Sequence, residues 1–388
     1  MDLSTAAILP TDPGALLFGR VWRPDVDGPS LVRVDGDRLV DVSAVFPTAH
    51  DLCEEPDPAV ALRDAQGEDL GPLAPIIANS DPAKRDRGQP SLLSPIDLQA
   101  VKAAGVTFVT SMLERVIEER ARGNPEAAVG IRAQVRDLVG DDLRALRPGS
   151  PEAMALKQAL IDAGAWSQYL EVGIGPDAEI FTKAQPMASV GAGQEIGVHP
   201  ASTWNNPEPE VVLVLASDGR IVGATLGNDV NLRDVEGRSA LLLGRAKDNN
   251  AAAAVGPFVR LFDGAFDLAA VETLSLTLTV TGEDGFVMQG SSEMREISRA
   301  PADLAAQVCN THHRYPDGLV LFLGTLFAPT QDRDEPGHGF THKVGDVVRI
   351  SAGPLGALVN RVTDTDRCEP WNFGAGALMR NLARRGLL

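Results

Sequence analysis

The sequence predicts an α+β fold that is rich in strands, with its helices concentrated in one insertion. Residues 274–292 alternate apolar and polar side chains around a Gly-containing turn, which is the pattern of a β-hairpin. Two apolar runs, 211–215 and 221–226, flank the turn Ser217-Asp218-Gly219-Arg220 and predict a second hairpin. Residues 111–122 instead place apolar side chains at helical spacing and are followed by Gly123. We therefore expect mixed sheets interrupted by a helical segment.

The N-terminal part predicts a small β domain. Residues 15–41 contain short apolar runs separated by Pro and Gly turns. Residues 48–95 are rich in Pro, Asp and Gly, and we expect an irregular connection there. The expected division is a β domain with its connection at 1–94 and a catalytic domain at 95–388.

The remaining elements follow from periodicity. Helices are expected at 111–122, 126–139 and 151–163, which together form an insertion over about 111–165. Strands are expected at 167–175, 179–185, in the two hairpins, and at 318–325 and 344–363. A helix at 301–312 and a helical tail at 373–385 complete the chain.

Composition excludes several classes of protein. The 388 residues are 44% hydrophobic and 23% charged, which is ordinary for a folded globular protein. The net charge of -18 argues against general nucleic-acid binding, because phosphate contacts require a basic surface. The acidic, Pro-containing N-terminus does not have the pattern of a signal peptide, and no run of about 20 apolar residues predicts a membrane span. Cys53, Cys309 and Cys368 are far apart, which is typical of reduced thiols, and we expect a cytoplasmic protein without a membrane partner.

Three carboxylates are expected to converge at the hairpin of residues 205–250. Glu208 and Glu210 are two residues apart in an extended segment, so they point the same way. The Asp-Gly turn brings the end of the second strand, with Asp229, back beside them. Carboxylates this close raise one another's pKa, and oxygen ligands with room for water suit Mg²⁺ or Mn²⁺. A solvated hairpin end is the alternative.

Further polar residues near this hairpin favour a functional site. Asn228, Arg233 and Glu236 lie in the segment that follows the return strand. Lys247 follows the apolar run 239–243, where a lysine is ordinarily a surface residue with a buried stem. Beside three carboxylates it becomes a candidate to bind an anionic substrate or to carry a proton.

These motifs, in this order, resemble the fumarylacetoacetate hydrolase superfamily. The resemblance rests on E-x-E, on GNDVNLRD, whose Asp229 comes nineteen residues after Glu210, on AKD, and on FTK and FLGT, and it covers about residues 95–388. It implies the family's C-terminal fold, a strand-rich mixed β-sandwich roll. It also implies Mg²⁺, with Mn²⁺ or Ca²⁺ as alternatives, held by Glu208, Glu210 and Asp229. The site residues that it implies are Lys247 and Lys183 as lysines of the active site and Thr325 as a receiver of the substrate carboxylate. Asn228, Arg233 and Glu236 are expected to bind substrate because they lie near the hairpin in sequence.

The departures from the family pattern shape the expected reaction. Hydrolases of the family have a His and a Glu that activate water, and here Ser111 replaces the His while Glu114 is retained. Serine is a poor general base near neutral pH without a partner, which makes C–C bond hydrolysis doubtful. Glu236 also stands where related enzymes often have Gln.

The segments LERVIEERARG, WSQYLEVGIGPDAEIFTK, WNNPEPEVVL and RNLARRGLL extend the similarity over the whole length, where the chain resembles the 2-keto-3-deoxy-D-pentonate dehydratases. This implies conversion of a small 2-oxo-3-deoxy sugar acid of the D-xylonate or D-arabinonate type to 2,5-dioxopentanoate and water, by a homodimer or homotetramer. The alternatives are a hydrolase of 2,4-dioxo acids, an oxaloacetate-type decarboxylase, or a binding protein without activity.

The expected chemistry is metal-assisted proton abstraction at C3 followed by loss of the C4 hydroxyl group. Glu114, Lys183 and Lys247 are the candidate proton carriers, and their individual roles stay open, as does a Schiff base on either lysine. Among the histidines, His312 and His313 are expected to end a helix, and His338 and His342 could border the pocket.

Overall fold

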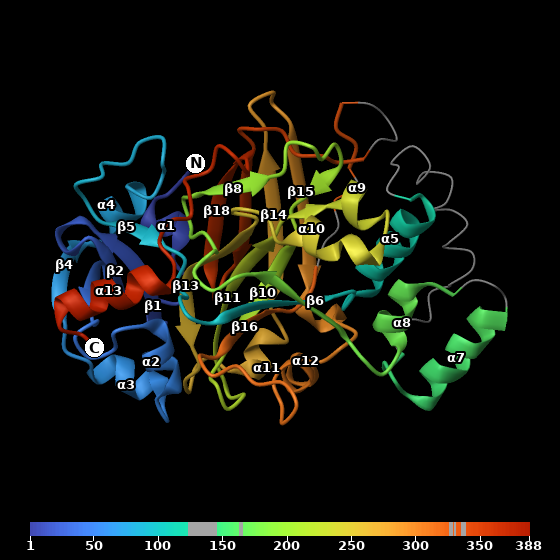
Figure 1. Ribbon diagram of the computed structural model, residues 1–388, viewed down its shortest axis with the longest axis horizontal. Coiled ribbons are helices and arrows are strands. Elements are labelled where there is room, and N and C mark those ends of the chain that lie inside the picture. The colour runs from blue at the N-terminus through green and yellow to red at the C-terminus, as the bar shows by residue number, and fades with distance from the viewer. Residues whose placement is uncertain (123–145, 163–165, 326–328, 330, 335–338) are drawn as a thin grey trace.

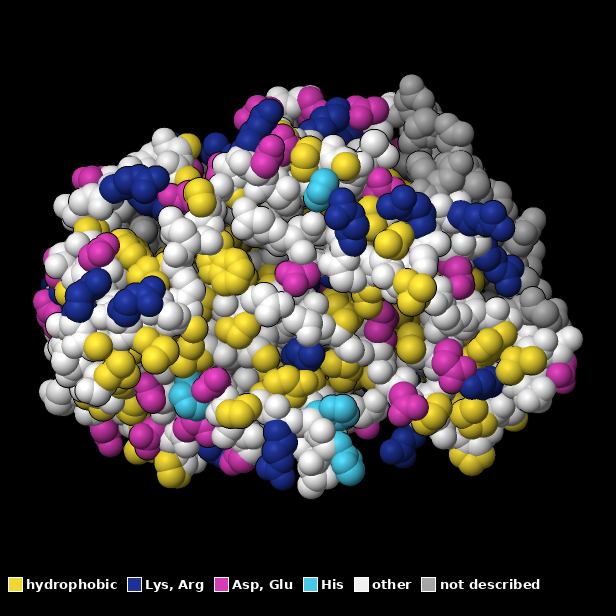
Figure 2. All heavy atoms as spheres, in the orientation of Figure 1, with side chains coloured by type: hydrophobic (Ala, Val, Ile, Leu, Met, Phe, Trp, Pro, Cys, Tyr) yellow, Lys and Arg dark blue, Asp and Glu magenta, His cyan; other side chains and the backbone are white. Residues whose placement is uncertain are grey.

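The computed structural model describes residues 1–122, 146–162, 166–325, 329, 331–334 and 339–388. Two sheets, one large and one smaller, form its centre, and helices lie around them (Figure 1). Within these residues no helix is both long and apolar enough to span a bilayer. Acidic and basic side chains are interspersed over the face shown in Figure 2.

The large sheet has eleven strands. In spatial order it contains β4 (Glu68–Pro72), β3 (Arg38–Asp41), β2 (Gly28–Asp35), β1 (Leu17–Arg23), β13 (Ala253–Leu261), β11 (Ile221–Asp229), β10 (Pro209–Leu215), β16 (Leu319–Phe322), β6 (Ala100–Gly105) and β7 (Glu179–Ala184), with β5 (Ser91–Leu93) paired to β1. β1 pairs with β13, so the strands of the expected N-terminal domain continue the sheet of the catalytic part. The boundary at residue 94 stays a prediction.

The smaller sheet has five strands in the order β15 (Val287–Glu293), β14 (Ser275–Thr281), β17 (Val347–Ala352), β18 (Gly356–Asp364) and β8 (Glu195–Val198). A separate ladder joins β9 (Asn205–Asn206) to β12 (Asn231–Leu232). β14 and β15 form the hairpin that alternation predicts, with Leu278 and Val280 buried between exposed or half-buried threonines.

The helices surround the sheets. They are α1 (Thr5–Ile8), α2 (Ala49–Glu54), α3 (Pro58–Asp64), α4 (Leu73–Ala78), α5 (Val109–Arg120), α7 (Pro151–Asp162), α8 (Gln168–Ile174), α9 (Arg233–Glu236), α10 (Leu243–Lys247), α11 (Leu268–Val271), α12 (Pro301–Val308) and α13 (Ala375–Arg385). In Figure 1, α2 and α3 lie on the side of the N-terminal strands, whereas α7 and α8 lie at the opposite end of the molecule.

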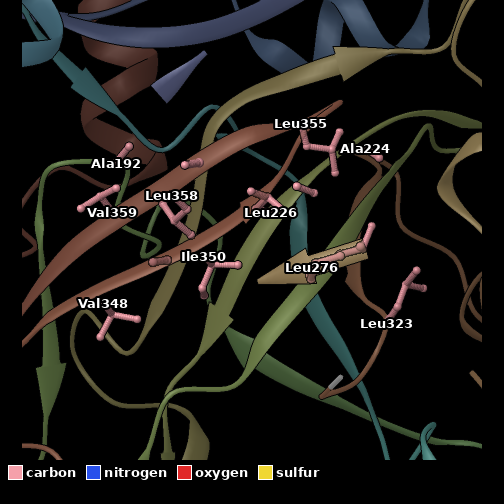
Figure 3. Packing of buried hydrophobic residues seen from close by; sticks show 14 of the residues in the cluster. Ala192, Ala224, Leu226, Leu276, Leu323, Val348, Ile350, Leu355, Leu358 and Val359 are labelled. Carbon is pink, nitrogen blue, oxygen red and sulfur yellow. The ribbon is translucent and has the colours of Figure 1, made fainter. Parts of the chain in front are cut away.

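β10 is buried on both faces and separates two cores. Val211 and Leu213 belong to a cluster shared with the smaller sheet, and Figure 3 shows this packing through Leu226, Ile350 and Leu358. Val212 and Val214 belong to the second cluster, which includes Leu52 and Leu62 of the helices α2 and α3. The second cluster also joins Ala184 of β7 to Ala253 of β13. The sheet is therefore curled, and β7 approaches the middle strands.

Two predicted elements were wrong. Residues 48–95 are not an irregular connection, because they contain α2, α3, α4, β4 and β5. Residues 168–174, expected as a strand, form α8, where Ser167 accepts a hydrogen bond from the Tyr169 amide and so caps the helix. The predicted α+β class with mixed sheets is confirmed, and the helix expected at 126–139 lies outside the described residues.

Candidate active site

The hairpin of β10 and β11 brings Glu208, Glu210 and Asp229 together. The Asp229 amide donates to the Glu208 carbonyl oxygen at 3.0 Å, and Glu210 pairs with Gly227 across the ladder. The three carboxylates offer oxygen atoms that lie within 4.8 Å of one another, and each residue is 1% exposed. The convergence expected from the sequence is present, while the role of these residues as metal ligands stays a prediction.

Asn228 lies on the other face of the sheet. It pairs with Pro209, so strand alternation turns its side chain away from Asp229. Its Oδ1 accepts a hydrogen bond from the Glu208 amide at 3.0 Å. The structure therefore places Asn228 behind the carboxylates, where it holds the start of β10, and its expected contact with substrate has no support in this geometry.

Two buried lysines neutralise part of the carboxylate charge. Lys183 Nζ lies 2.7 Å from Asp229 Oδ1 and also donates to the carbonyl oxygens of Val230 at 2.9 Å and Lys247 at 2.6 Å. Lys247 Nζ contacts Glu208 Oε2 at 2.5 Å and Asp229 Oδ2 at 3.0 Å. Burial lowers the pKa of Lys183. Burial would lower the pKa of Lys247 too, but Asp229 and Glu208 outweigh it and raise the pKa.

A third cation, Arg115 of α5, approaches from the helical side. Its Nη2 pairs with Glu208 Oε1, and its Nη1 lies 2.9 Å from Glu236 Oε2. Glu236 belongs to the short helix α9 and its side chain is 5% exposed. Sequence analysis did not identify Arg115, because one arginine among several on an amphipathic helix carries no signal of its own.

The pKa values of the two glutamates of E-x-E are pushed apart. Burial alone would raise the pKa of Glu208, but Arg115 and Lys247 outweigh it and lower the pKa to about 2. Burial, followed by the charges of Asp229 and Glu208, raises the pKa of Glu210 well above its usual range. A divalent cation among the three carboxylates would remove this conflict, and three oxygen donors are the chemistry that Mg²⁺ prefers. The residues present therefore fit a divalent cation.

Thr325 and Arg233 differ in the residues that they contact. Thr325 Oγ1 donates to Glu210 Oε1 at 3.4 Å, and the neighbouring Gly324 amide donates to Glu210 Oε2 at 2.7 Å. Arg233 is buried, stacks on Trp204 at 4.6 Å and donates to the Pro329 carbonyl oxygen at 3.1 Å. Thr325 thus touches Glu210 directly, whereas Arg233 contacts Trp204 and Pro329.

Glu179 is a site residue that sequence analysis missed. It lies on β7 at the same alternation as Phe181, whose ring centroid is 5.5 Å from Lys247 Nζ. Burial, followed by the charge of Glu236, raises the pKa of Glu179 to about 7. Gly105 pairs with Glu179, and a Cβ atom at Gly105 would overlap the Glu179 carboxylate. The signal in the sequence was period two over Glu179 and Phe181, and the ladder with β6 shifts its register between Thr182 and Ala184, at Lys183.

Ser111 and Glu114 lie on α5, and their side chains are outside the described part of the structure. His338 is also outside the described residues. His342 is buried 3.3 Å from Asp346, where burial lowers its pKa. His312 and His313 follow α12, which ends at Val308, so they do not end a helix as expected.

The comparisons with known proteins assign the family. Residues 165–363 match the family model for the fumarylacetoacetate hydrolase C-terminal domain. The chain belongs to this family.

Two curated relatives have names that state an enzyme activity. The chain is 32% identical over 195 residues to a probable 2-keto-3-deoxyxylonate dehydratase of Haloferax volcanii, a match that covers 50% of this chain and 63% of the relative. It is 32% identical over 184 residues to the 2-dehydro-3-deoxy-D-arabinonate dehydratase of Saccharolobus solfataricus, covering 47% and 58%. The match therefore spans about three fifths of the length of either relative.

Solved structures share the fold. A 2-keto-3-deoxy-D-arabinonate dehydratase in its apo form superposes with a TM-score of 0.61 at 21% identity, covering 90% of this chain and 99% of the other. A second structure of that name, complexed with magnesium and 2,5-dioxopentanoate, gives the same values.

Proposed function

We propose that this protein is a Mg²⁺-dependent hydro-lyase that converts 2-dehydro-3-deoxy-D-pentonate to 2,5-dioxopentanoate and water. The observation that carries the proposal is the buried set of Glu208, Glu210 and Asp229, whose oxygen atoms lie within 4.8 Å of one another. The names of the curated relatives, and the magnesium and 2,5-dioxopentanoate in one solved structure of the same fold, support it.

Glu208, Glu210 and Asp229 would hold the cation. Bound there, it would withdraw electrons from the 2-oxo group and, by taking up charge from Glu208 and Asp229, weaken the attraction that keeps Lys247 protonated. Thr325, which contacts Glu210, would donate to the C1 carboxylate of the substrate.

Lys247 is our choice for the group that removes the C3 proton. Its ammonium group has three donors and, within the described residues, donates to Glu208 and Asp229, so its side chain can turn towards a ligand at the same carboxylates. Lys183 is a weaker choice, because Asp229 and two backbone carbonyl oxygens already accept from its ammonium group, which has three donors. We assign Lys183 the role of fixing Asp229 and the backbone at Lys247.

Glu179 is our choice for the acid that protonates the departing C4 hydroxyl group. A carboxyl group with a pKa of about 7 is partly protonated at neutral pH and can still release its proton. Removal of the C3 proton and departure of C4–OH as water leave a C3–C4 double bond, and tautomerisation from C5 gives the aldehyde. Glu114 remains a candidate for either proton transfer.

The test is an assay of the purified protein with 2-dehydro-3-deoxy-D-pentonate and Mg²⁺, with and without EDTA. We expect aldehyde that forms with Mg²⁺ and not with EDTA. Release of CO₂ from oxaloacetate, or cleavage of a 2,4-dioxo acid, without aldehyde from the pentonate would replace the proposal with the decarboxylase or the hydrolase. The same preparation, run by size-exclusion chromatography with light scattering, tests the homodimer or homotetramer that we infer.

A further inference from the structure

Two buried asparagines, the amide pair Asn206 and Asn231, lie next to the carboxylate set, and the proposed reaction does not use them. Asn206 of β9 stands directly opposite Asn231 of β12. Asn231 is 0% exposed and Asn206 is 2% exposed. Within the described residues, Oδ1 and Nδ2 of Asn231 and Oδ1 of Asn206 have no hydrogen-bond partner, while Nδ2 of Asn206 donates to the Pro207 carbonyl oxygen at 2.9 Å. Buried polar groups without partners are costly, which indicates that a bound group completes them.

Three other buried asparagines have partners within the protein. Asn205, the adjacent residue of β9, accepts from the His342 amide at 3.1 Å and donates to Ser202 Oγ at 3.3 Å. Asn360 and Asn381 each donate to two backbone carbonyl oxygens. Open amide groups are therefore not a general property of buried asparagines in this structure.

Strand alternation turns the amide pair to the face that carries the carboxylates. Val230 and Leu232 both belong to the core shared with the smaller sheet. Alternation therefore turns Asn231 to the opposite side, where Asp229 lies. Asn206 shares that face, because residues directly opposite one another in a ladder project to the same side.

The amide pair follows the carboxylates along the direction in which a substrate would extend. Asn206, Glu208 and Glu210 alternate along one segment, and Gly324 and Thr325 contact Glu210 at its far end. Residues two apart on one face of a strand are separated by about 7 Å. A 2-oxo acid with its C1 carboxylate at Thr325 and its 2-oxo oxygen among the carboxylates therefore extends its C5 end towards the amide pair.

We propose that Asn206 and Asn231 bind the terminal hydroxyl group of the substrate and thereby make the site select hydroxylated 2-oxo acids over those with an apolar end. An amide offers both a donor and an acceptor, and a hydroxyl group can accept and donate, so the two groups satisfy each other. An apolar end leaves the buried amide groups unpaired, and a site built to bind a hydroxyl group discriminates strongly for this reason. The inference rests on the proposed function, since it takes a metal-bound 2-oxo acid as the ligand.

Two five-carbon ligands that differ only at C5 test the inference without turnover. 5-Hydroxy-2-oxopentanoate ends in a hydroxyl group and 2-oxopentanoate ends in a methyl group, and neither has the C4 hydroxyl group that the reaction removes. We would titrate each into the Mg²⁺-loaded protein by isothermal calorimetry, after a Mg²⁺ titration that establishes the metal affinity of each variant. The quantity compared is the ratio of the two dissociation constants, because the fraction of free ligand that cyclises is the same for every variant.

We expect wild-type protein to bind 5-hydroxy-2-oxopentanoate at least about tenfold more tightly than 2-oxopentanoate. Asn231→Ala should bring the two dissociation constants close to equality. Asn231→Leu, which fills the space of the amide with an apolar side chain of similar size, should do the same and should melt at no lower temperature than the wild type, since it removes unpaired polar groups. Asn205→Ala is the matched control: it loses bonds to Ser202 and His342, so it should be less stable but keep the wild-type ratio.

Equal binding of both ligands by the wild type, or a wild-type ratio in both Asn231 variants, would overturn the inference. Absence of binding of both ligands would do so too, as would the same loss of discrimination in Asn205→Ala. These results are independent of aldehyde formation. Aldehyde from the pentonate without discrimination between the two ligands would keep the proposed reaction and remove the amide pair from the substrate site. Discrimination without aldehyde would sink the reaction and leave the amide pair as a hydroxyl-binding site.

Discussion

Single residues of the site differ in protonation because their surroundings differ. Glu208, between Arg115 and Lys247, has a pKa lowered to about 2, whereas the pKa of Glu179 is raised to about 7 by burial and by Glu236. Two glutamates in one site are thus suited to opposite tasks. One holds charge at every physiological pH, and the other can give up a proton.

The pH dependence of activity should reflect the titration of the Glu179 carboxyl group. Since the protonated form is the acid, kcat/KM should fall as the pH rises through about 7. Glu179→Gln cannot donate a proton from a carboxyl group, so it should lower kcat by about 10²- to 10⁴-fold and remove this limb of the profile. Glu272→Gln, the same change at the end of α11, is the control and should keep the wild-type profile. An unaltered limb in Glu179→Gln would assign the titration to another group.

Glu179 also contributes a pH dependence to stability. Its pKa of about 7 in the folded state lies above the usual glutamate value of 4.5, so the folded state binds more protons than the unfolded state between these values. The stabilisation of the folded state by protonation of Glu179 is therefore fully present below about pH 4.5, and it is lost as the pH rises through about 7. Above that pH, Glu179→Gln should melt at a higher temperature than the wild type, in the same samples that are used for the activity profile.

At the scale of elements, strand β11 positions Asp229 through close packing at Gly227. A Cβ atom at Gly227 would overlap the Phe322 ring and the Val212 side chain, both fully buried. Gly227→Ala should therefore destabilise the fold by about 1–3 kcal/mol, as overpacking of a core does, and should weaken Mg²⁺ binding by displacing the strand end. Chemical denaturation and calorimetry measure the two effects.

Gly244→Ala is the matched control for that change. A Cβ atom at Gly244, in α10, meets nothing within 4 Å, and alanine is the better helix former. We expect this variant to gain stability and to keep the metal affinity of the wild type. If both variants lost the same stability, packing at Gly227 would not be the cause.

The elements that the sequence predicts best are those with strict periodicity. β10, β11 and β14 have clear apolar runs or alternation, and their turns contain Asp-Gly. α8 was mistaken for a strand because its seven residues are too few to show a period of 3.6, and its Ser167 cap resembles any loop serine. Asn228 was placed in the site by proximity in sequence, and the alternation of β11 turns it to the other face.

The remainder of the site could not be read from the sequence because it depends on the curl of the sheet. Arg115 is far in sequence from Glu208 and reaches it from α5, and Glu179 lies on β7, where the charge of Glu236 raises its pKa. No local pattern encodes that approach. The three carboxylates, by contrast, come from one hairpin, whose geometry is local.

At the scale of the whole molecule, a divalent cation should stabilise the fold as a ligand of the native state. The buried carboxylate set forms only when β10 and β11 pair, so the unfolded chain offers no comparable site. At a Mg²⁺ concentration about 100 times the dissociation constant, the expected gain is about 2.7 kcal/mol. Differential scanning calorimetry with Mg²⁺ and with EDTA measures it. Glu208→Gln should lose most of the increase, and an equal increase in that variant would place the cation elsewhere.

The position of β7 at the edge of the large sheet also affects the solubility of the protein. It is the last strand of the large sheet in the described structure, with only β6 beside it, so its free backbone edge is of the kind on which another chain could add a strand. Charged side chains on such a strand discourage this addition, and β7 begins with Glu179, which is half-buried. The proton chemistry and the resistance to aggregation then depend on the same residue. An apolar replacement of Glu179 should precipitate where Glu179→Gln stays in solution.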